Sequence, residues 1–102
     1  MSKTVAFDVD GTLIDFDDNP REEIIAKLRQ HAINGDIVYV WSGGGIDYAQ
    51  RVVSRLHLDR YVDAVIAKQR YPTLPDITYD DMVIKLGKRN IHVGPFEHEE
   101  RW

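Results

Sequence analysis

The stretch TVAFDVDGTL at residues 4–13 decides the fold of this chain. Residues 4–9 are mostly apolar and have the length and composition of a short buried strand. Asp8 and Asp10 stand two residues apart at the carboxyl end of this expected strand, so their carboxylates project to the same side. Gly11 follows and allows the chain to turn sharply. Because ligands bind at the carboxyl ends of strands in open α/β sheets, these acids mark the expected site.

Apolar runs and helical patterns alternate along the rest of the chain. The sequence Asn19-Pro20-Arg21-Glu22 predicts a helix with Asn19 as its N-cap, which Asn34-Gly35 should end. A second helix is expected over 46–56 and a brief one over 82–86. Further strands are expected at 37–41, 62–67, 77–79 and 91–93. This order predicts an α/β fold, namely a Rossmann-like three-layer sandwich with a mostly parallel sheet of about five strands covered on both faces.

Length and composition narrow the classes of protein. The chain has 102 residues, which indicates a single domain over 1–102 with a solvated C-terminal tail at about 96–102. The net charge of −4 gives no general support for binding to nucleic acid or to a membrane surface. There is no cysteine, so disulfides, thiolate zinc sites and cysteine nucleophiles are excluded. No apolar run approaches the ~20 residues of a membrane helix, and no signal peptide is recognisable, so we expect a soluble cytoplasmic protein.

Polar residues stand at the carboxyl ends of four successive expected strands. Because the carboxyl ends of parallel strands meet at one edge of a sheet, we expect their side chains to converge. These residues are Asp8 with Asp10, Ser42, Lys68, and Asp80 with Asp81.

This set of side chains suits phosphoryl chemistry. Asp8 is able to attack phosphorus and form an aspartyl-phosphate. Asp10 is able to protonate the leaving oxygen and later to deprotonate the attacking water. The hydroxyl of Ser42, the backbone N–H of Gly43 and the ammonium of Lys68 suit the oxygens of the phosphoryl group.

Further acids suit a divalent metal. Asp80 and Asp81 complete, with Asp8, a set of oxygen ligands of the kind that Mg²⁺ prefers. Asp76 with Asp80 is an alternative pair. We favour the adjacent pair because residues 77–79 then form the strand that delivers it.

The motifs resemble those of the haloacid dehalogenase-like superfamily, in its phosphohydrolase branch. The resemblance extends from about Val5 to Val93. The segment DVDGTL at 8–13 looks like the first motif of the family, Ser42 the second, Lys68 the third and Asp80-Asp81 the fourth.

The resemblance implies a role for each acid. Asp8 would be the nucleophile and a metal ligand, and Asp10 the acid/base that also offers its backbone carbonyl to Mg²⁺. Asp80 would be a side-chain metal ligand, while Asp81 would ligate the metal or hold a metal-bound water. The implied activity is that of a Mg²⁺-dependent phosphatase that hydrolyses phosphate monoesters through an aspartyl-phosphate.

Members of this superfamily often carry a cap domain over the site, and the chain between Asp8 and Ser42 has no room for one. We therefore expect a capless enzyme whose site lies open, for small or accessible macromolecular substrates, or is covered by another subunit of a homo-oligomer. The alternatives are a polynucleotide or phosphoprotein phosphatase of the same mechanism, a phosphotransferase or mutase, and a non-enzymatic phosphate- or Mg²⁺-binding module. Nucleic acid is expected only as a substrate, and a membrane is not expected as a partner.

Overall fold

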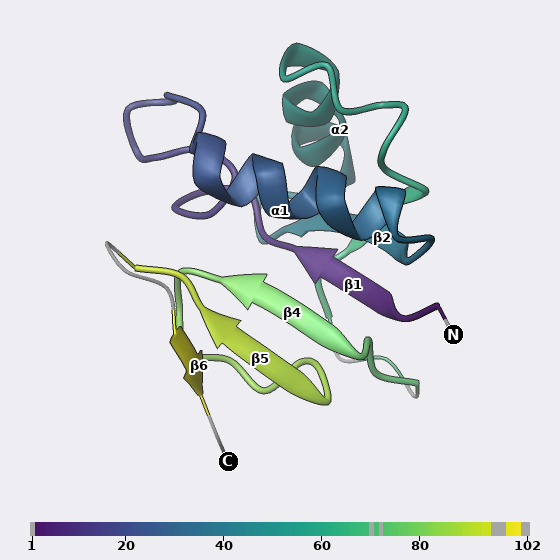
Figure 1. The fold of residues 1–102 in the computed structure, drawn as a ribbon. Coiled ribbons are helices and arrows are strands. Elements are labelled where there is room, and N and C mark those ends of the chain that lie inside the picture. Colours follow the sequence, from purple (N-terminus) through teal and green to yellow (C-terminus); the bar gives the residue numbers. More distant parts are fainter. Residues whose placement is uncertain (1, 70, 72, 95–97, 101–102) are drawn as a thin grey trace.

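A computed structural model describes residues 2–69, 71, 73–94 and 98–100. The strands form one six-stranded sheet in the order β3-β2-β1-β4-β5-β6 (Figure 1). Strands β1 to β5 run parallel, and β6 pairs antiparallel with β5. The predicted α/β class and its mostly parallel sheet are confirmed. The elements are β1 (Thr4–Phe7), α1 (Glu22–Ile33), β2 (Ile37–Ser42), α2 (Ile46–Arg55), β3 (Ala64–Ala67), β4 (Ile77–Asp80), β5 (Arg89–His92) and β6 (His98–Glu100).

Strand β1 is the centre of the topology. The chain moves outward from β1 to β2 and β3, then crosses back and adds β4 on the other side of β1. Phe7 is paired with both Val40 of β2 and Tyr79 of β4. The Asp8 N–H then donates to the Tyr79 carbonyl at 2.9 Å, which carries the pairing to the strand ends. The ends of β1 and β4 therefore flank the point where the strand order reverses, the usual place for a ligand in an open α/β sheet.

One face of the sheet carries the hydrophobic core. Paired residues in parallel strands point to the same side, so Val5, Val38 and Ile77 share a face. Both helices pack on this face. The segments that connect the helices to the strands contribute further fully buried side chains to the same core. The helical residues of this core are Ile24, Ile25 and Leu28 of α1 and Ala49, Val52 and Val53 of α2.

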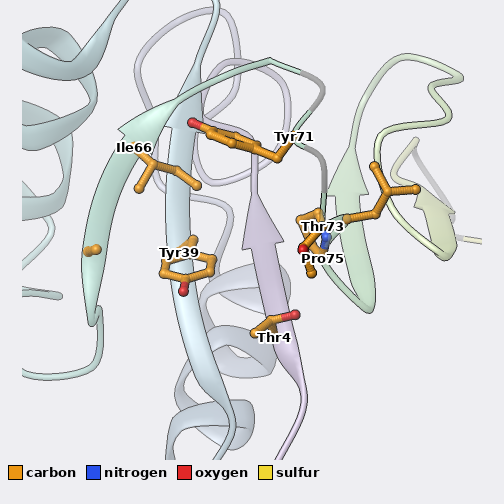
Figure 2. Close-up of a pocket in the computed structure, with 8 residues that line it drawn as sticks. Thr4, Tyr39, Ile66, Tyr71, Thr73 and Pro75 are labelled. Atoms are coloured by element: carbon orange, nitrogen blue, oxygen red, sulfur yellow. The ribbon is translucent and has the colours of Figure 1, made fainter.

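In the described part of the chain, neither helix packs on the opposite face of the sheet. The β3–β4 connection lies against part of this face. Tyr71 stacks on Trp41 with ring centroids 6.4 Å apart and an interplanar angle of 6°, and its hydroxyl donates to the Ala67 carbonyl. Next to this contact, the loop and the sheet enclose a mostly apolar hollow of about 590 Å³ (Figure 2). The β3–β4 connection is short and contains Pro75, so a loop takes the place of a helix here.

The start of α1 differs from the prediction. Asn19 is not the N-cap, since the helix begins at Glu22 with Arg21 in the cap position. The Asp15 carboxylate instead accepts hydrogen bonds from the Asn19 backbone N–H at 2.9 Å and from its side-chain amide at 3.2 Å. Pro20 is bridged antiparallel to the strand-like Ile14. Asn19 and Pro20, which were predicted to begin the helix, therefore close a small hairpin that precedes it.

The short helix expected over 82–86 is absent, and this segment is irregular. The buried Asn90 side chain organises the end of this connection, because it accepts from the Gly87 N–H at 3.0 Å and donates to the Gly87 carbonyl at 2.9 Å. The Thr78 hydroxyl donates to the same Asn90 oxygen at 2.7 Å. Side-chain bonds to the backbone thus replace helical bonds, and β5 begins at Arg89, earlier than expected.

The expected C-terminal tail is only partly described. Residues 98–100 form β6, so they extend the sheet and do not form a free tail. The other residues of that tail (96, 97, 101 and 102) lie outside the described part of the chain. No helix among the described residues has both the length and the apolar character needed to cross a bilayer.

A polar network joins α1 to the sheet. His31 Nδ1 lies 2.8 Å from Asp36 Oδ2, and His31 Nε2 lies 3.0 Å from the Tyr79 hydroxyl. Tyr79 in turn stacks on Phe7 with ring centroids 4.5 Å apart. Asp36 also accepts from the Lys3 backbone N–H at 3.1 Å. These bonds, led by the one from His31, hold the pKa of Asp36 below its usual value.

We expect Asp36→Asn to lower the free energy of unfolding at pH 7 by about 1 kcal/mol, the typical value of such a hydrogen bond. Because the folded-state pKa of Asp36 is depressed, its contribution is present above the ordinary aspartate pKa and is lost as the pH falls through the lower folded value. Urea unfolding at a series of pH values should therefore show the two proteins converging in acid. Equal stability of both proteins at pH 7 would contradict this role.

Candidate functional site

Three strand ends meet through one lysine. Lys68 directly follows β3, while Asp8 directly follows β1 and Asp80 is the last residue of β4. The Lys68 ammonium lies 3.0 Å from Asp8 Oδ1 and 2.6 Å from Asp80 Oδ2. Strands β3 and β4 are not neighbours, because β2 and β1 lie between them. The lysine side chain therefore ties together the edge of the sheet that the topology marks for a ligand.

A third carboxylate joins this pair. Asp8, Asp80 and Asp81 each offer an oxygen within 4.8 Å of the others. Asp8 is 5% exposed and Asp80 is 1% exposed, whereas Asp81 is half-buried. Asp81 comes this close because Gly11 has no side chain: a Cβ there would lie 2.5 Å from Asp81 Oδ2. Gly11 also has φ +80°, a conformation that favours glycine. Gly11 of the DVDGTL segment thus makes room for Asp81.

Burial shifts the pKa values of the ionisable groups in this cluster. Burial, followed by the charge of Asp80, raises the pKa of Asp8 to about 7 in spite of Lys68. Burial raises the pKa of Asp80 as well. For Lys68, burial works to lower the pKa, but hydrogen bonding and charge from Asp80 and Asp8 raise it above its usual value. One ammonium therefore faces more negative charge than it neutralises.

The residues of the cluster fit a hard divalent cation. All three side chains offer carboxylate oxygens, the donor type that Mg²⁺ prefers. Asp80 Oδ2 is buried, and the Lys68 ammonium lies 2.6 Å from it. A cation would also stabilise the charged forms of the buried acids. Asp8, Asp80 and Asp81 are thus the side chains that could hold Mg²⁺.

Asp10 lies outside this group of carboxylates and has a different partner. The Tyr48 hydroxyl, on α2, donates to Asp10 Oδ1 at 2.5 Å. This hydrogen bond, together with burial, raises the pKa of Tyr48 to about 12, so the hydroxyl keeps its proton at neutral pH. Asp10 is part of a tight turn in which the N–H groups of Thr12, Leu13 and Ile14 all point to the Val9 carbonyl.

Ser42 is the last residue of β2, next to β1, and Gly43 follows it in the loop that leads into α2. Ser42 is buried, and its hydroxyl oxygen accepts from the Gly44 N–H at 3.0 Å. Gly43 is exposed. Within the described part of the chain, neither residue contacts the cluster of Lys68 and the three acids through a hydrogen bond or ion pair. They form a separate group beside it, in an exposed glycine loop that leads to the start of a helix, a setting that suits an anion.

Asp76 lies at the other end of β4 from Asp80. Its carboxylate accepts from the Thr4 N–H at 2.9 Å and lies 3.5 Å from the Lys88 ammonium. Since Thr4 begins β1, this acid is placed at the amino ends of the strands. The structure therefore brings Asp81, and not Asp76, to the other acids.

Sequence reasoning missed two residues of this edge. Tyr48 contacts Asp10, and Thr12 lies with its hydroxyl 3.5 Å from Asp8 Oδ2. Thr12 belongs to the quoted DVDGTL segment, so its position offered a signal. Tyr48 follows the glycines after Ser42 by one helical turn, and nothing in that spacing alone indicates a contact with Asp10.

Comparison of this chain with protein-family models, with characterised proteins and with solved structures found no match.

We expect Asp8→Asn to stabilise the metal-free protein at pH 8 by an amount on the order of 2 kcal/mol. The pKa of Asp8 is raised to about 7, so the folded protein loses stability as the pH rises from the ordinary aspartate value through 7. The asparagine variant lacks this loss. Thermal unfolding with EDTA at several pH values measures the difference, and Asp59→Asn, an exposed site beyond α2, serves as the matched control. A lower melting temperature for Asp8→Asn at pH 8 would contradict this account.

Lys68→Met should have the opposite effect. It leaves Asp8 and Asp80 buried without their cation, which typically costs about 3–5 kcal/mol. Added Mg²⁺ should recover part of this loss, since binding to the folded state alone stabilises it. Urea unfolding with EDTA and with Mg²⁺ tests both statements. Unchanged stability in EDTA would show that the ion pairs do not support the fold.

Proposed function

We propose that this protein is a Mg²⁺-dependent phosphohydrolase of the haloacid dehalogenase-like type, which cleaves phosphate monoesters through an aspartyl-phosphate on Asp8. One observation carries the proposal: Lys68 is paired with both Asp8 and Asp80 where the strand order reverses, and Asp81 lies in the same group. A nucleophile, a cation for phosphoryl oxygens and a set of metal ligands thus share one sheet edge.

In the first half-reaction, a carboxylate oxygen of Asp8 attacks phosphorus, and the bond from phosphorus to the ester oxygen breaks. Asp10, in its protonated form, gives its proton to that departing oxygen, so the alcohol leaves neutral. Lys68, already 3.0 Å from Asp8, holds the nucleophile and offers positive charge to the phosphoryl oxygens. Ser42 and the N–H of Gly43 are proposed to bind those oxygens from the side of β2.

In the second half-reaction, water attacks the phosphorus of the aspartyl-phosphate. The Asp10 carboxylate takes a proton from that water, the bond between phosphorus and Asp8 breaks, and inorganic phosphate is released. Both aspartates return to their starting forms. Mg²⁺, held by Asp8, Asp80, Asp81 and the backbone carbonyl of Asp10, would offset the negative charge of the carboxylates and of the phosphoryl group.

The contact of Asp10 with Tyr48 favours an enzyme over a module that only binds phosphate or Mg²⁺. A binding module needs the metal ligands but has no use for an additional carboxyl outside that group. Asp10 is such a carboxyl, and the Tyr48 hydroxyl holds it at 2.5 Å. A carboxyl that is held in place and does not belong to the metal-ligand group suits a general acid and base.

The test is the hydrolysis of 4-nitrophenyl phosphate. We expect turnover with Mg²⁺, no turnover in excess EDTA, and a loss of about a thousandfold or more in kcat for Asp8→Asn, since the nucleophile is then absent. Asp59→Asn makes the same chemical change away from the site and should retain wild-type activity.

Two results would reject the proposal. Activity that survives Asp8→Asn, or that is unaffected by EDTA, excludes the mechanism. Saturable binding of Mg²⁺ and of inorganic phosphate with no hydrolysis of any ester supports the binding module instead.

A further inference from the structure

We propose that Tyr48 is a positioning residue for Asp10, orienting this carboxyl for proton transfer to the leaving group. The inference rests on the proposed function and extends it to a residue outside the sequence motifs. The contact itself is direct: the Tyr48 hydroxyl donates to Asp10 Oδ1 at 2.5 Å.

Tyr48 is fixed by the fold in three ways. It is the third residue of α2, and the next residue, Ala49, is fully buried in the core. Its ring lies close to Gly44, where an added Cβ would be 3.0 Å from Tyr48 Cδ2. The guanidinium of Arg51, one turn later on α2, lies 6.0 Å from the centroid of the ring. A ring held by its helix and by both of these neighbours offers a hydroxyl of defined position.

The same ring connects the two polar groups of the site. Gly44 donates its N–H to the Ser42 hydroxyl oxygen, and a Cβ on Gly44 would lie 3.3 Å from that oxygen as well as against Tyr48. Tyr48 thus packs beside the proposed phosphate-binding loop while its hydroxyl reaches Asp10. We infer that α2 sets the position of Asp10 relative to the phosphoryl group.

The hydrogen bond has a chemical consequence. With Oδ1 accepting from Tyr48, the proton that Asp10 transfers is carried by Oδ2, and the plane of the carboxyl is defined. General acid catalysis contributes most when the departing alkoxide is a poor leaving group, and least when it is stable without a proton. Loss of the Tyr48 hydroxyl should therefore slow the cleavage of unactivated esters selectively.

The experiment compares wild-type protein and Tyr48→Phe on a series of phosphate monoesters, from 4-nitrophenyl through phenyl to a simple alkyl phosphate, with saturating Mg²⁺. We compare kcat/KM, which reports the first half-reaction alone, because Asp10 also acts in the second half-reaction, which is the same for every ester. For Tyr48→Phe we expect kcat/KM to stay within about threefold on 4-nitrophenyl phosphate and to fall by about tenfold or more on the alkyl ester. The dependence of log kcat/KM on the pKa of the leaving alcohol should be steeper for the variant.

Tyr61→Phe is the matched control. Tyr61 also lies partly buried against the core, beyond the end of α2, with the guanidinium of Arg29 5.8 Å from its ring centroid. It loses the same hydroxyl without touching the site, so its leaving-group dependence should equal that of the wild-type protein.

A double-mutant cycle with Asp10→Asn separates positioning from general destabilisation. If Tyr48 acts through Asp10, adding Tyr48→Phe to Asp10→Asn should change the first-turnover rate of alcohol release by less than about twofold. An equal fall in kcat/KM on every ester, or a full additional loss in the Asp10→Asn background, would overturn the role of Tyr48 and leave the proposed function intact. Absence of hydrolysis by the wild-type protein on all esters would overturn both.

Discussion

The Lys68 ammonium lies between two buried carboxylates, and the architecture of the site depends on this contact. Asp8 and Asp80 stand at the ends of adjacent strands, where backbone pairing brings their charges together whatever their mutual repulsion. A cation delivered from β3 offsets that repulsion at 3.0 and 2.6 Å. Buried charges need such pairing, because desolvation otherwise favours their neutral forms. With Asp81 nearby, the carboxylates of this cluster outnumber the single ammonium.

Different elements of the fold position the side chains at this edge of the sheet. Strands β1 and β4 position Asp8 and Asp80 at their carboxyl ends, since the backbone of each strand is paired on both sides. Helix α2 contributes Tyr48, whose hydroxyl donates a hydrogen bond to Asp10. Both helices pack on one face of the sheet, while the β3–β4 connection lies against part of the other. The side chains at the strand ends thus project from paired strands, which is the kind of support that a preorganised site requires.

Local sequence patterns predicted the secondary structure correctly where the composition of a single segment decides it. The apolar runs located β1 to β4, because buried strands have few polar residues. By contrast, β5 begins earlier than expected, and β6 lies in a segment predicted as a tail. The Asn19-Pro20 helix start failed, since the Asp15 side chain captures Asn19 and closes a hairpin first. The helix expected over 82–86 failed for a similar reason, since Asn90 binds the backbone at Gly87. Short polar side chains compete with helical hydrogen bonds for the same backbone groups, and the local sequence pattern does not show which side chain lies close enough to do so.

The sequence by itself determined the α/β class and the polar residues that follow each strand, because both depend on alternation along the chain and on the common direction of parallel strands. Tertiary structure decided which of those residues meet. It brought Lys68 past β2 to two acids, placed Asp81 rather than Asp76 in the cluster, and set Tyr48 on Asp10. These contacts depend on side-chain reach, strand order and helix orientation across the sheet, and no spacing within one segment encodes them.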